Sequence, residues 1–321
     1  MIIITGAAGF IGSCLAKRLN TEGYKDLVLV DDFNNPDKHT NLTDVHFHLK
    51  IDRSIFIEWL KKHCQTVQAI LHIGARTNTA EFDVALLNKL NTAYTQSLWH
   101  IAVAEGIPFI YASSAATYGL GEHGFKDDEK LMPLLKPLNP YGQSKLDFDL
   151  WALKQDRKPG FWAGFKFFNV YGPNEYHKGR MGSVIMHAFN QIKTTGKLNL
   201  FQSHHPDYKD GEQLRDFVSV LDVVNVLLYF LENRKHSGIY NLGTGKAESF
   251  NTLGNAVFEA LDKKPDISYI PTPLDIRDKY QYYTCADIDK LRNAGYTDSF
   301  IGLHEGTKSY VRQYLNKKAY F

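Results

Sequence analysis

Tyr141 and Lys145 stand four residues apart in the run YGQSK, and this spacing places two side chains on the same face of a helix. A free phenol has a pKa of about 10 and is a poor base at neutral pH. A neighbouring ammonium and an oxidised nicotinamide would both stabilise the phenolate and lower that pKa. The pair therefore predicts a general acid and base that interconverts a hydroxyl and a ketone. Because the spacing is common, an exposed pair on a helix is the other interpretation.

Two hydroxyl side chains, Ser113 and Ser114, follow the apolar run FIYA at 109–112, which predicts a strand. Ligands of an open parallel sheet bind beyond the carboxyl ends of its strands. We therefore expect Ser114 to hydrogen-bond the reacting oxygen of a substrate. Without the tyrosine and lysine pair, a serine-rich turn would be the better interpretation.

A glycine-rich loop, GAAGFIG at 6–12, directly follows the apolar run IIIT and precedes a helical stretch. Glycines in a dinucleotide-binding loop allow a tight turn, a close approach of the backbone to a pyrophosphate and close packing of helix on strand. The helix that follows offers free N–H groups and the positive end of its dipole. We expect the loop to bind a dinucleotide rather than to form a turn without a ligand. The expected contacts are Gly6, Gly9, Phe10, Ile11 and Gly12.

The identity of the dinucleotide depends on the charges that follow the second predicted strand, which ends at Asp31. A carboxylate about 20 residues after the glycine loop binds the adenosine ribose, and it repels the 2′-phosphate of NADP, so Asp31 favours NAD. Lys38 and Arg53 lie nearby in the sequence and could supply positive charge for that phosphate. Together with Asp32, they could equally form a solvated loop. The residues alone leave NADP and NAD both open.

These side chains need elements that bring them to one edge of a sheet. Apolar β-branched or aromatic runs predict strands at 2–5, 27–30, 69–73, 109–112 and 164–169. Helical segments over 10–19, 88–105 and 144–154 separate several of these strands. Strands that alternate with helices predict an α/β fold with a Rossmann-type, doubly wound parallel sheet.

After residue 170 the sequence becomes richer in loops and aromatic residues, with a helix expected over 222–231 and a strand over 239–242. We expect a nucleotide-binding Rossmann domain at 1–170 that is completed by about 217–243. A smaller mixed α/β substrate-binding domain, interleaved with the first, would consist of 171–216 and 244–321. The length of 321 residues agrees with two domains of about 150 residues each.

Composition argues against several classes of protein. A hydrophobic fraction of 44% and a charged fraction of 22% are typical of a globular chain rather than a disordered one. A net charge of +2 lacks the positive excess of a dedicated binder of nucleic acids or anionic membranes. Three cysteines without a C-x-x-C pair argue against disulfides and a zinc site, and we expect no metal. Neither a signal peptide nor a membrane-spanning run is evident, which favours a cytoplasmic location.

Five motifs resemble, in this order, those of the extended short-chain dehydrogenase/reductase family, the NAD(P)-dependent epimerases and dehydratases. They are GAAGFIG at 6–12, SSAATYG at 113–119, YGQSK at 141–145, FFNVYGP at 167–173 and RDFV at 215–218. The resemblance covers nearly the whole chain and implies that Ser114, Tyr141 and Lys145 form the catalytic set. Dehydratases of the family usually carry Thr-Asp-Glu near the serine, whereas the SSA run here is similar to an epimerase or a simple dehydrogenase.

Longer stretches are similar to the ADP-heptose 6-epimerases within that family: MIIITGAAGFIGS at 1–13, NVYGPNEYHKGRMGSV at 169–184 and SGIYNLGTGKAESF at 237–250. This narrower resemblance implies an ADP-heptose substrate, whose C6 is inverted through a 6-keto intermediate for the inner core of lipopolysaccharide. It also implies a tightly held NADP contacted by Lys38 and Arg53, and a homo-oligomer, with a pentamer as one candidate. Lys178 would be a second acid/base group opposite Tyr141, and Lys145 would tune the tyrosine and contact the cofactor ribose.

Further residues are candidate contacts of the nucleotide sugar. The guanidinium of Arg215 suits a pyrophosphate, since its fork binds oxygens bidentately. Phe201 and Tyr280 could pack on the adenine or the sugar, or belong to the core of the smaller domain. Asn169, at the end of the fifth predicted strand, and His187 complete the expected set, together with Ser114 and Lys178.

Two positions depart from the family pattern: Ser219 follows RDFV where tyrosine is frequent, and Asp32 stands where asparagine is common. A UDP-hexose 4-epimerase of the same family is the alternative enzyme. It would share Ser114, Tyr141 and Lys145 without requiring Lys178. A nucleotide-binding sensor without activity is a third hypothesis, although such proteins typically lose the tyrosine or the lysine.

Overall fold

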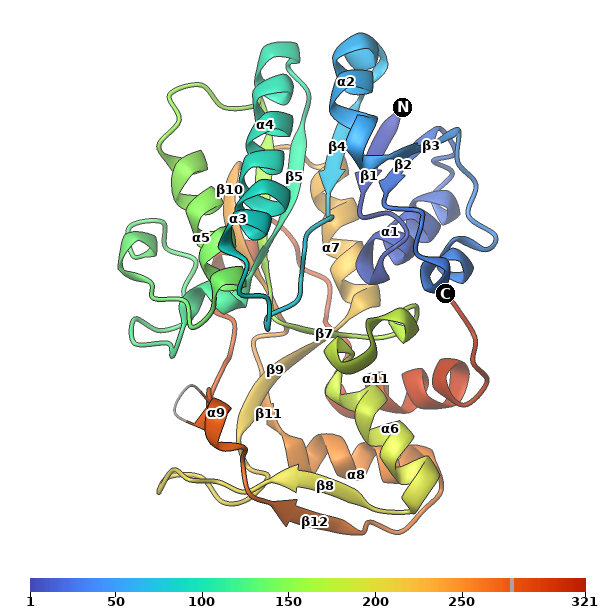
Figure 1. Ribbon diagram of the computed structural model, residues 1–321, viewed down its shortest axis with the longest axis vertical. Helices are drawn as coiled ribbons and strands as arrows, with labels where there is room; N and C mark the ends of the chain where they lie inside the picture. Colours follow the sequence, from blue (N-terminus) through green and yellow to red (C-terminus); the bar gives the residue numbers. More distant parts are fainter. Residues whose placement is uncertain (278–279) are drawn as a thin grey trace.

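Seven parallel strands form the largest sheet of the computed structural model, which describes residues 1–277 and 280–321 (Figure 1). Their order is β10-β6-β5-β4-β1-β2-β3. β1 pairs with both β2 and β4, so the strand order reverses at this point. This order confirms the predicted doubly wound, Rossmann-type sheet. The strands are β1 (Ile2–Thr5), β2 (Leu27–Asp31), β3 (Leu49–Asp52), β4 (Ala69–His72), β5 (Phe109–Ser114), β6 (Trp162–Phe167) and β10 (Gly238–Leu242).

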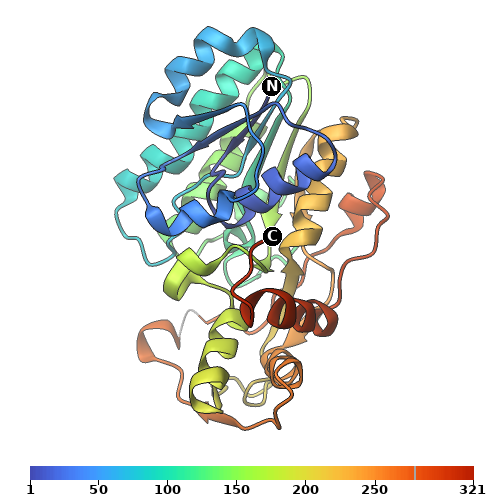
Figure 2. The same cartoon turned by 90° about the vertical axis from the view of Figure 1, so that its right-hand side faces the viewer.

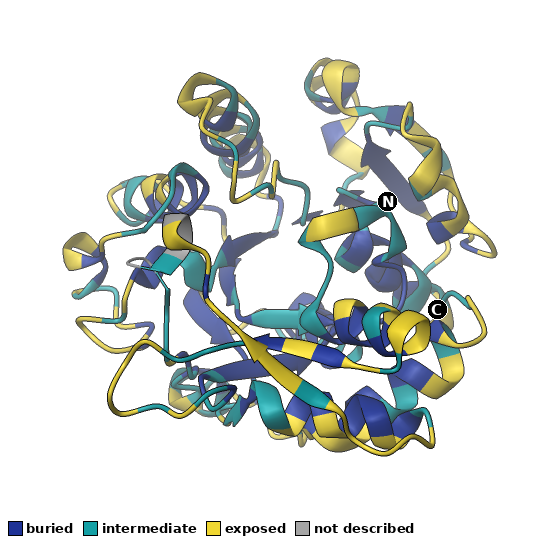
Figure 3. Cartoon of the chain, turned by 60° about the horizontal axis from the view of Figure 1, so that its bottom comes forward, coloured by how far each residue is buried: buried dark blue, intermediate teal, exposed yellow. Residues whose placement is uncertain are grey.

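Both faces of this sheet are covered by helices. Ile2 and Ile4 belong to the core on one face and Ile3 to the core on the other, because successive side chains of a strand alternate. Helices α1 (Phe10–Thr21) and α7 (Val220–Glu232) cover the first face. The second is covered by α2 (Arg53–His63), α4 (Tyr94–Glu105) and α5 (Pro140–Leu153). In Figure 3 the strands are mostly buried, whereas the outer sides of the helices are exposed. Strands buried on both faces are nearly continuous apolar runs, which is why the sequence predicts them.

A smaller part of the chain lies below the large sheet in Figures 1 and 2 and has a separate core. One three-stranded sheet has the order β11-β9-β7, and a two-stranded parallel sheet pairs β12 with β8. The strands are β7 (Asn169–Tyr171), β8 (Leu198–Phe201), β9 (Leu214–Ser219), β11 (Ala247–Ser249) and β12 (Ile267–Ile270). The main helices are α6 (Val184–Thr195), α8 (Phe250–Ala260) and α11 (Leu303–Ser309).

Short helices connect these elements. They are α3 (Val84–Leu87), α9 (Leu274–Arg277), α10 (Asp289–Asn293), η1 (Pro36–Leu42), η2 (Cys64–Thr66), η3 (Asn88–Ala93), η4 (Ala115–Tyr118), η5 (Met132–Leu134), η6 (Tyr176–Met181) and η7 (Tyr310–Leu315). Among the described residues, none of the helices combines the length and the apolar character needed to cross a membrane.

The fifth predicted strand, 164–169, differs from the structure at both ends. β6 starts two residues earlier and stops at Phe167, and Asn169 begins β7 in the smaller sheet. Between them, the amide of Phe168 donates to the carbonyl of Leu242 at 3.0 Å. Asn169 then pairs with Phe217 of β9 and does not end a strand of the large sheet. The apolar run continues through both strands, so periodicity alone does not mark the change of sheet.

Replacement of Gly12 by alanine tests the packing between the glycine loop and α1. A Cβ at this position would lie 2.1 Å from the carbonyl oxygen of Gly6, which is backbone and cannot rotate away. We expect Gly12→Ala to lower the free energy of unfolding by about 1–3 kcal/mol, measured by chemical denaturation. Gly160→Ala is the control, because a Cβ added to Gly160 would meet no heavy atom within 4 Å. Equal denaturation midpoints for the two variants would contradict this account.

Candidate active site

A groove of about 810 Å³ runs along the carboxyl ends of β1, β2 and β4, where the strand order reverses. Ligand pockets typically have volumes of about 300–1,000 Å³. Tyr141 and Lys145 lie outside its described lining. The other predicted cofactor residues all line the groove: Gly6, Gly9, Phe10, Ile11, Gly12, Asp31, Asp32, Lys38 and Arg53.

The glycine loop forms a cradle from which side chains are excluded. Gly6 adopts a φ of +68°, a conformation that glycine reaches without strain. A Cβ on Gly6 would lie 2.5 Å from the Cα of Gly74, which follows β4. The start of α1 has no side-chain cap at Gly9, so its first amides can donate to a phosphate. The cradle therefore fits the pyrophosphate of a dinucleotide.

Two acidic residues at the end of β2 are each paired with a cation. Asp31 is buried, and its Oδ2 accepts the amide of Ala8 at 2.9 Å while its Oδ1 accepts Lys38 Nζ at 3.0 Å. Asp32 is more exposed and pairs with Arg53 at 3.3 Å. Each carboxylate that would repel a 2′-phosphate thus has a cation beside it that would attract one.

Tyr141 lies in the first turn of α5, and the preceding residues determine where this helix starts. The side chain of Asn139 accepts the amide of Gly142 at 2.8 Å, and Pro140 occupies the first helical position, where an N–H has no partner. This start places the phenol near Ser114 at the end of β5. Burial raises the pKa of Tyr141, and the neighbouring Ser114 side chain lowers it in part.

Lys145 follows one helical turn later and is also buried. Its Nζ donates to the carbonyl of Ala112 at 2.8 Å, two residues before Ser114. Burial lowers the pKa of Lys145 to about 8, and the carboxylate of Asp149 raises it in part. The sequence predicted that this ammonium would lower the pKa of Tyr141. In the structure, burial raises the pKa of this phenol, and the opposing effect comes from Ser114 rather than from Lys145.

The outer side of α5 is held by the segment that precedes α4. Thr92 Oγ1 donates to the carbonyl of Ser144 at 3.0 Å.

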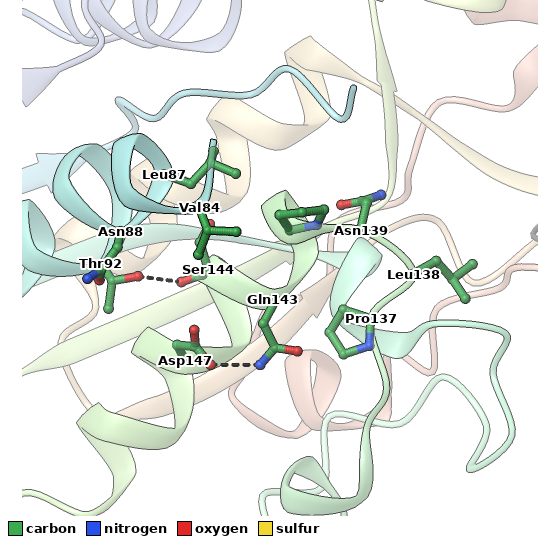
Figure 4. A pocket seen from close by; sticks show the side chains of 11 residues that line it. Val84, Leu87, Asn88, Thr92, Pro137, Leu138, Asn139, Gln143, Ser144 and Asp147 are labelled. Carbon is green, nitrogen blue, oxygen red and sulfur yellow. Dashed lines mark hydrogen bonds between the residues drawn. The ribbon is translucent and has the colours of Figure 1, made fainter. Parts of the chain in front are cut away.

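A second pocket, of about 360 Å³, lies between α3 and the start of α5 (Figure 4). Apolar side chains, including Val84 and Leu87, form part of its wall. Its described lining shares no residue with the cofactor groove, so the two cavities are separate.

Lys178 reaches the cofactor groove from the loop after β7. Its Nζ lies 5.1 Å from the centroid of the Phe10 ring. Burial lowers the pKa of Lys178, and Glu175 raises it in part. A lysine with a lowered pKa can act as a base near neutral pH.

A buried carboxylate, Glu175, holds the two ends of that loop together. It accepts hydrogen bonds from the amide and the hydroxyl of Ser183, both at 2.6 Å. The hydroxyl of Tyr310 donates to it at 3.0 Å. The position of Lys178 therefore depends on packing between this loop and η7.

Part of the groove wall was not predicted from the sequence. The segment 73–78, directly after β4, lines the groove together with Lys89 and Tyr94. Its place after a parallel strand was the available signal. His177 also lines the groove, and burial lowers its pKa to about 4. Asn41 Nδ2 lies 3.2 Å from the Nδ1 of this histidine.

Arg215, Phe201 and Tyr280 lie together in the smaller part of the chain. The guanidinium of Arg215 is 5.4 Å from the centroid of the Tyr280 ring, and the rings of Phe201 and Tyr280 meet edge to face at 6.2 Å. Arg215 is buried and donates to the carbonyls of Leu214, at 2.9 Å, and Gln281. The three side chains form one cationic and aromatic cluster.

The two remaining candidates, Asn169 and His187, have other partners. Asn169 Nδ2 donates to the carbonyl of Asp216 at 3.0 Å. His187 is exposed on α6, and its Nε2 lies 3.2 Å from the carbonyl oxygen of Arg180. Among the described hydrogen bonds, none joins either side chain to the catalytic candidates.

Comparison with known proteins agrees with this geometry. The profile of the NAD dependent epimerase/dehydratase family matches residues 2–243. The ADP-L-glycero-D-manno-heptose-6-epimerase of Fusobacterium nucleatum is 47% identical, over 99% of this chain and 99% of that protein.

Two solved structures extend the comparison. The Helicobacter pylori ADP-L-glycero-D-manno-heptose-6-epimerase is 28% identical, with a TM-score of 0.81 over 97% of this chain and 95% of that chain. MoeE5, solved in complex with UDP-glucose and NAD, is 25% identical, with a TM-score of 0.78 over 99% of each chain. From its glycine cradle, its strand order and these similarities, the chain belongs to the NAD-dependent epimerase/dehydratase family.

Proposed function

We propose that the protein is an ADP-heptose 6-epimerase that inverts C6 of ADP-D-glycero-D-manno-heptose, with NADP as its cofactor. A relative named for this activity is 47% identical over nearly its whole length. The observation that carries the proposal is the burial of Lys178 in the groove lined by the glycine loop. This lysine supplies a second titratable group besides Tyr141, which a 4-epimerase would not require.

The residues of the site suit a reaction that passes through a ketone. C6 bears no acidic proton, so inversion by simple deprotonation is difficult. A nicotinamide bound in the groove would supply hydride transfer, from C6 of the sugar and back to the opposite face of the resulting 6-keto group. Tyr141 takes the proton of the 6-hydroxyl while Ser114 holds the same oxygen by a hydrogen bond. The ammonium of Lys145 stabilises the phenolate.

Lys178 serves the second orientation of the sugar. After the intermediate turns, its oxygen faces away from Tyr141 and needs another proton donor. Burial lowers the pKa of Lys178, which makes this ammonium a better proton donor to the sugar oxygen. One group on each side of the sugar then suffices for both directions of the epimerisation.

Binding is divided between the two parts of the chain in this proposal. The amides at Phe10 and Ile11 hold the cofactor pyrophosphate, and Lys38 and Arg53 hold its 2′-phosphate. The segments 171–216 and 244–321 bind the substrate. There Arg215 contacts the pyrophosphate of ADP-heptose, and Phe201 and Tyr280 pack on its adenine or sugar.

Substitution of the two acid/base groups tests the mechanism. We expect Tyr141→Phe and Lys178→Met each to lower kcat for ADP-D-glycero-D-manno-heptose by about 10²–10⁴-fold, because each removes a proton-transfer group. Epimerisation is followed by chromatographic separation of the two epimers.

Lys62→Met, an exposed lysine on α2, is the matched control and should retain the wild-type rate. Full activity of Lys178→Met would refute the role of this lysine. Turnover of UDP-galactose in place of the ADP-heptose by the wild-type protein would favour the 4-epimerase instead.

The cofactor is tested by denaturing the purified protein and identifying the released dinucleotide by mass spectrometry. We expect NADP. We also expect Lys38→Ala to weaken NADP binding more than NAD binding, since NAD lacks the 2′-phosphate that the Lys38 ammonium would contact. Because the hydride returns to the sugar, NADPH should not accumulate during turnover. Release of NAD, or steady accumulation of reduced cofactor, would contradict the proposal.

A further inference from the structure

A fully buried ion pair lies beneath the candidate catalytic residues. Asp149 of α5 and Lys166 of β6 have no exposed side-chain surface, and Lys166 Nζ is 2.6 Å from Asp149 Oδ2. Removing two charges from water is costly, and such pairs often add little to stability compared with apolar residues of similar size. Neither residue has a role predicted from the sequence, so the pair calls for another explanation.

The hydrogen bonds of this pair lead to the Ser114 segment by two routes. The hydroxyl of Ser113 donates to Asp149 Oδ2 at 2.7 Å. Lys166 Nζ donates to Thr117 Oγ1 at 2.8 Å, and this hydroxyl in turn donates to the carbonyl of Ser114 at 2.8 Å. Two hydrogen bonds therefore restrain Ser114: one is made by the preceding residue, Ser113, and the other is accepted by the carbonyl group of Ser114 itself.

The same pair is attached to the helix that carries the other candidates. Asp149 follows Lys145 by four residues and Tyr141 by eight, so the three side chains share one face of α5. Lys145 makes the second link between helix and strand, since its Nζ donates to the carbonyl of Ala112 in β5. The relative position of α5 and the end of β5 is thus determined by polar contacts as well as by apolar packing.

We propose that Asp149 and Lys166, acting through the hydroxyls of Ser113 and Thr117, are positioning residues that hold Ser114 against Tyr141. A hydrogen bond has strict requirements of distance and angle, whereas apolar contacts between a helix and a sheet tolerate small sliding movements. A displacement of about 1 Å at a reacting group can cost on the order of 10²-fold in rate. This inference rests on the roles proposed above, in which Tyr141 exchanges the proton of the reacting hydroxyl and Ser114 binds its oxygen.

The test removes single hydroxyls, because replacing one member of a buried ion pair can prevent folding. Ser113→Ala and Thr117→Val each break one link to the Ser114 segment. Tyr111→Phe is the matched control, since the Tyr111 hydroxyl donates to the other oxygen of Asp149, Oδ1, at 3.0 Å and is not linked to Ser114. Thr117→Ser restores the hydroxyl and is the rescue variant.

We expect Ser113→Ala and Thr117→Val to lower kcat by about 10- to 100-fold with KM changed less than about twofold. Tyr111→Phe and Thr117→Ser should stay within about twofold of the wild-type kcat, because both keep the links to Ser114. Equal losses in Tyr111→Phe and Thr117→Val would show a general effect of buried hydrogen bonds and would overturn the proposal. Unchanged kcat in both Ser113→Ala and Thr117→Val would overturn it as well.

A second measurement does not depend on the substrate. The ¹³Cζ resonance of Tyr141 in tyrosine-labelled protein, assigned by its absence in Tyr141→Phe, reports the surroundings of the phenol, including the position of Ser114. It should shift in Ser113→Ala and Thr117→Val and stay unchanged in Thr117→Ser. A wild-type protein inactive on ADP-heptose but with these shifts would refute the proposed function and leave the positioning role intact. Unshifted resonances in all variants would refute the positioning role.

Discussion

Where the loop after β1, the start of α1 and the end of β4 meet, backbone lies directly on backbone. A Cβ on Gly6 or Gly12 would overlap main-chain atoms of Gly74 or of Gly6 itself. This close approach determines how closely α1 packs on the sheet, and it leaves the first amides of the helix facing the groove. It also occurs where the strand order reverses, which is the place where an open parallel sheet forms a crevice. The packing of the first helix thus depends on the same glycines that line the proposed cofactor site.

Charge within the groove and beneath it is balanced locally. Asp31 is offset by Lys38, Asp32 by Arg53, and Asp149 by Lys166. A buried group that lacks such a partner changes its protonation behaviour instead, as burial lowers the pKa of Lys178. The three ion pairs join residues of different elements and so help to hold the framework.

The parts of the site that could be predicted are those with short spacing in the sequence. The glycine loop, the pair Tyr141 and Lys145, and the serines that end β5 each lie within a few residues of a strand end or a helix start. The helix predicted over 144–154 begins earlier in the structure, at Pro140, because Asn139 and Pro140 form its N-terminus. The change of sheet between Phe167 and Asn169 was not predicted, since both strands are apolar and differ only in their neighbours.

The sequence by itself determined the alternation of strands and helices, the glycine loop and the identity of the candidate acid/base groups. These features follow from local periodicity and from residue types at fixed offsets. Only the tertiary structure decided which partners the charged groups take. Lys145 bonds the carbonyl of Ala112, and Asp149 pairs with Lys166 rather than facing solvent. Such pairs join residues from different elements, and the hydrogen bond forms only after helix and sheet have packed to within about 3 Å at those atoms.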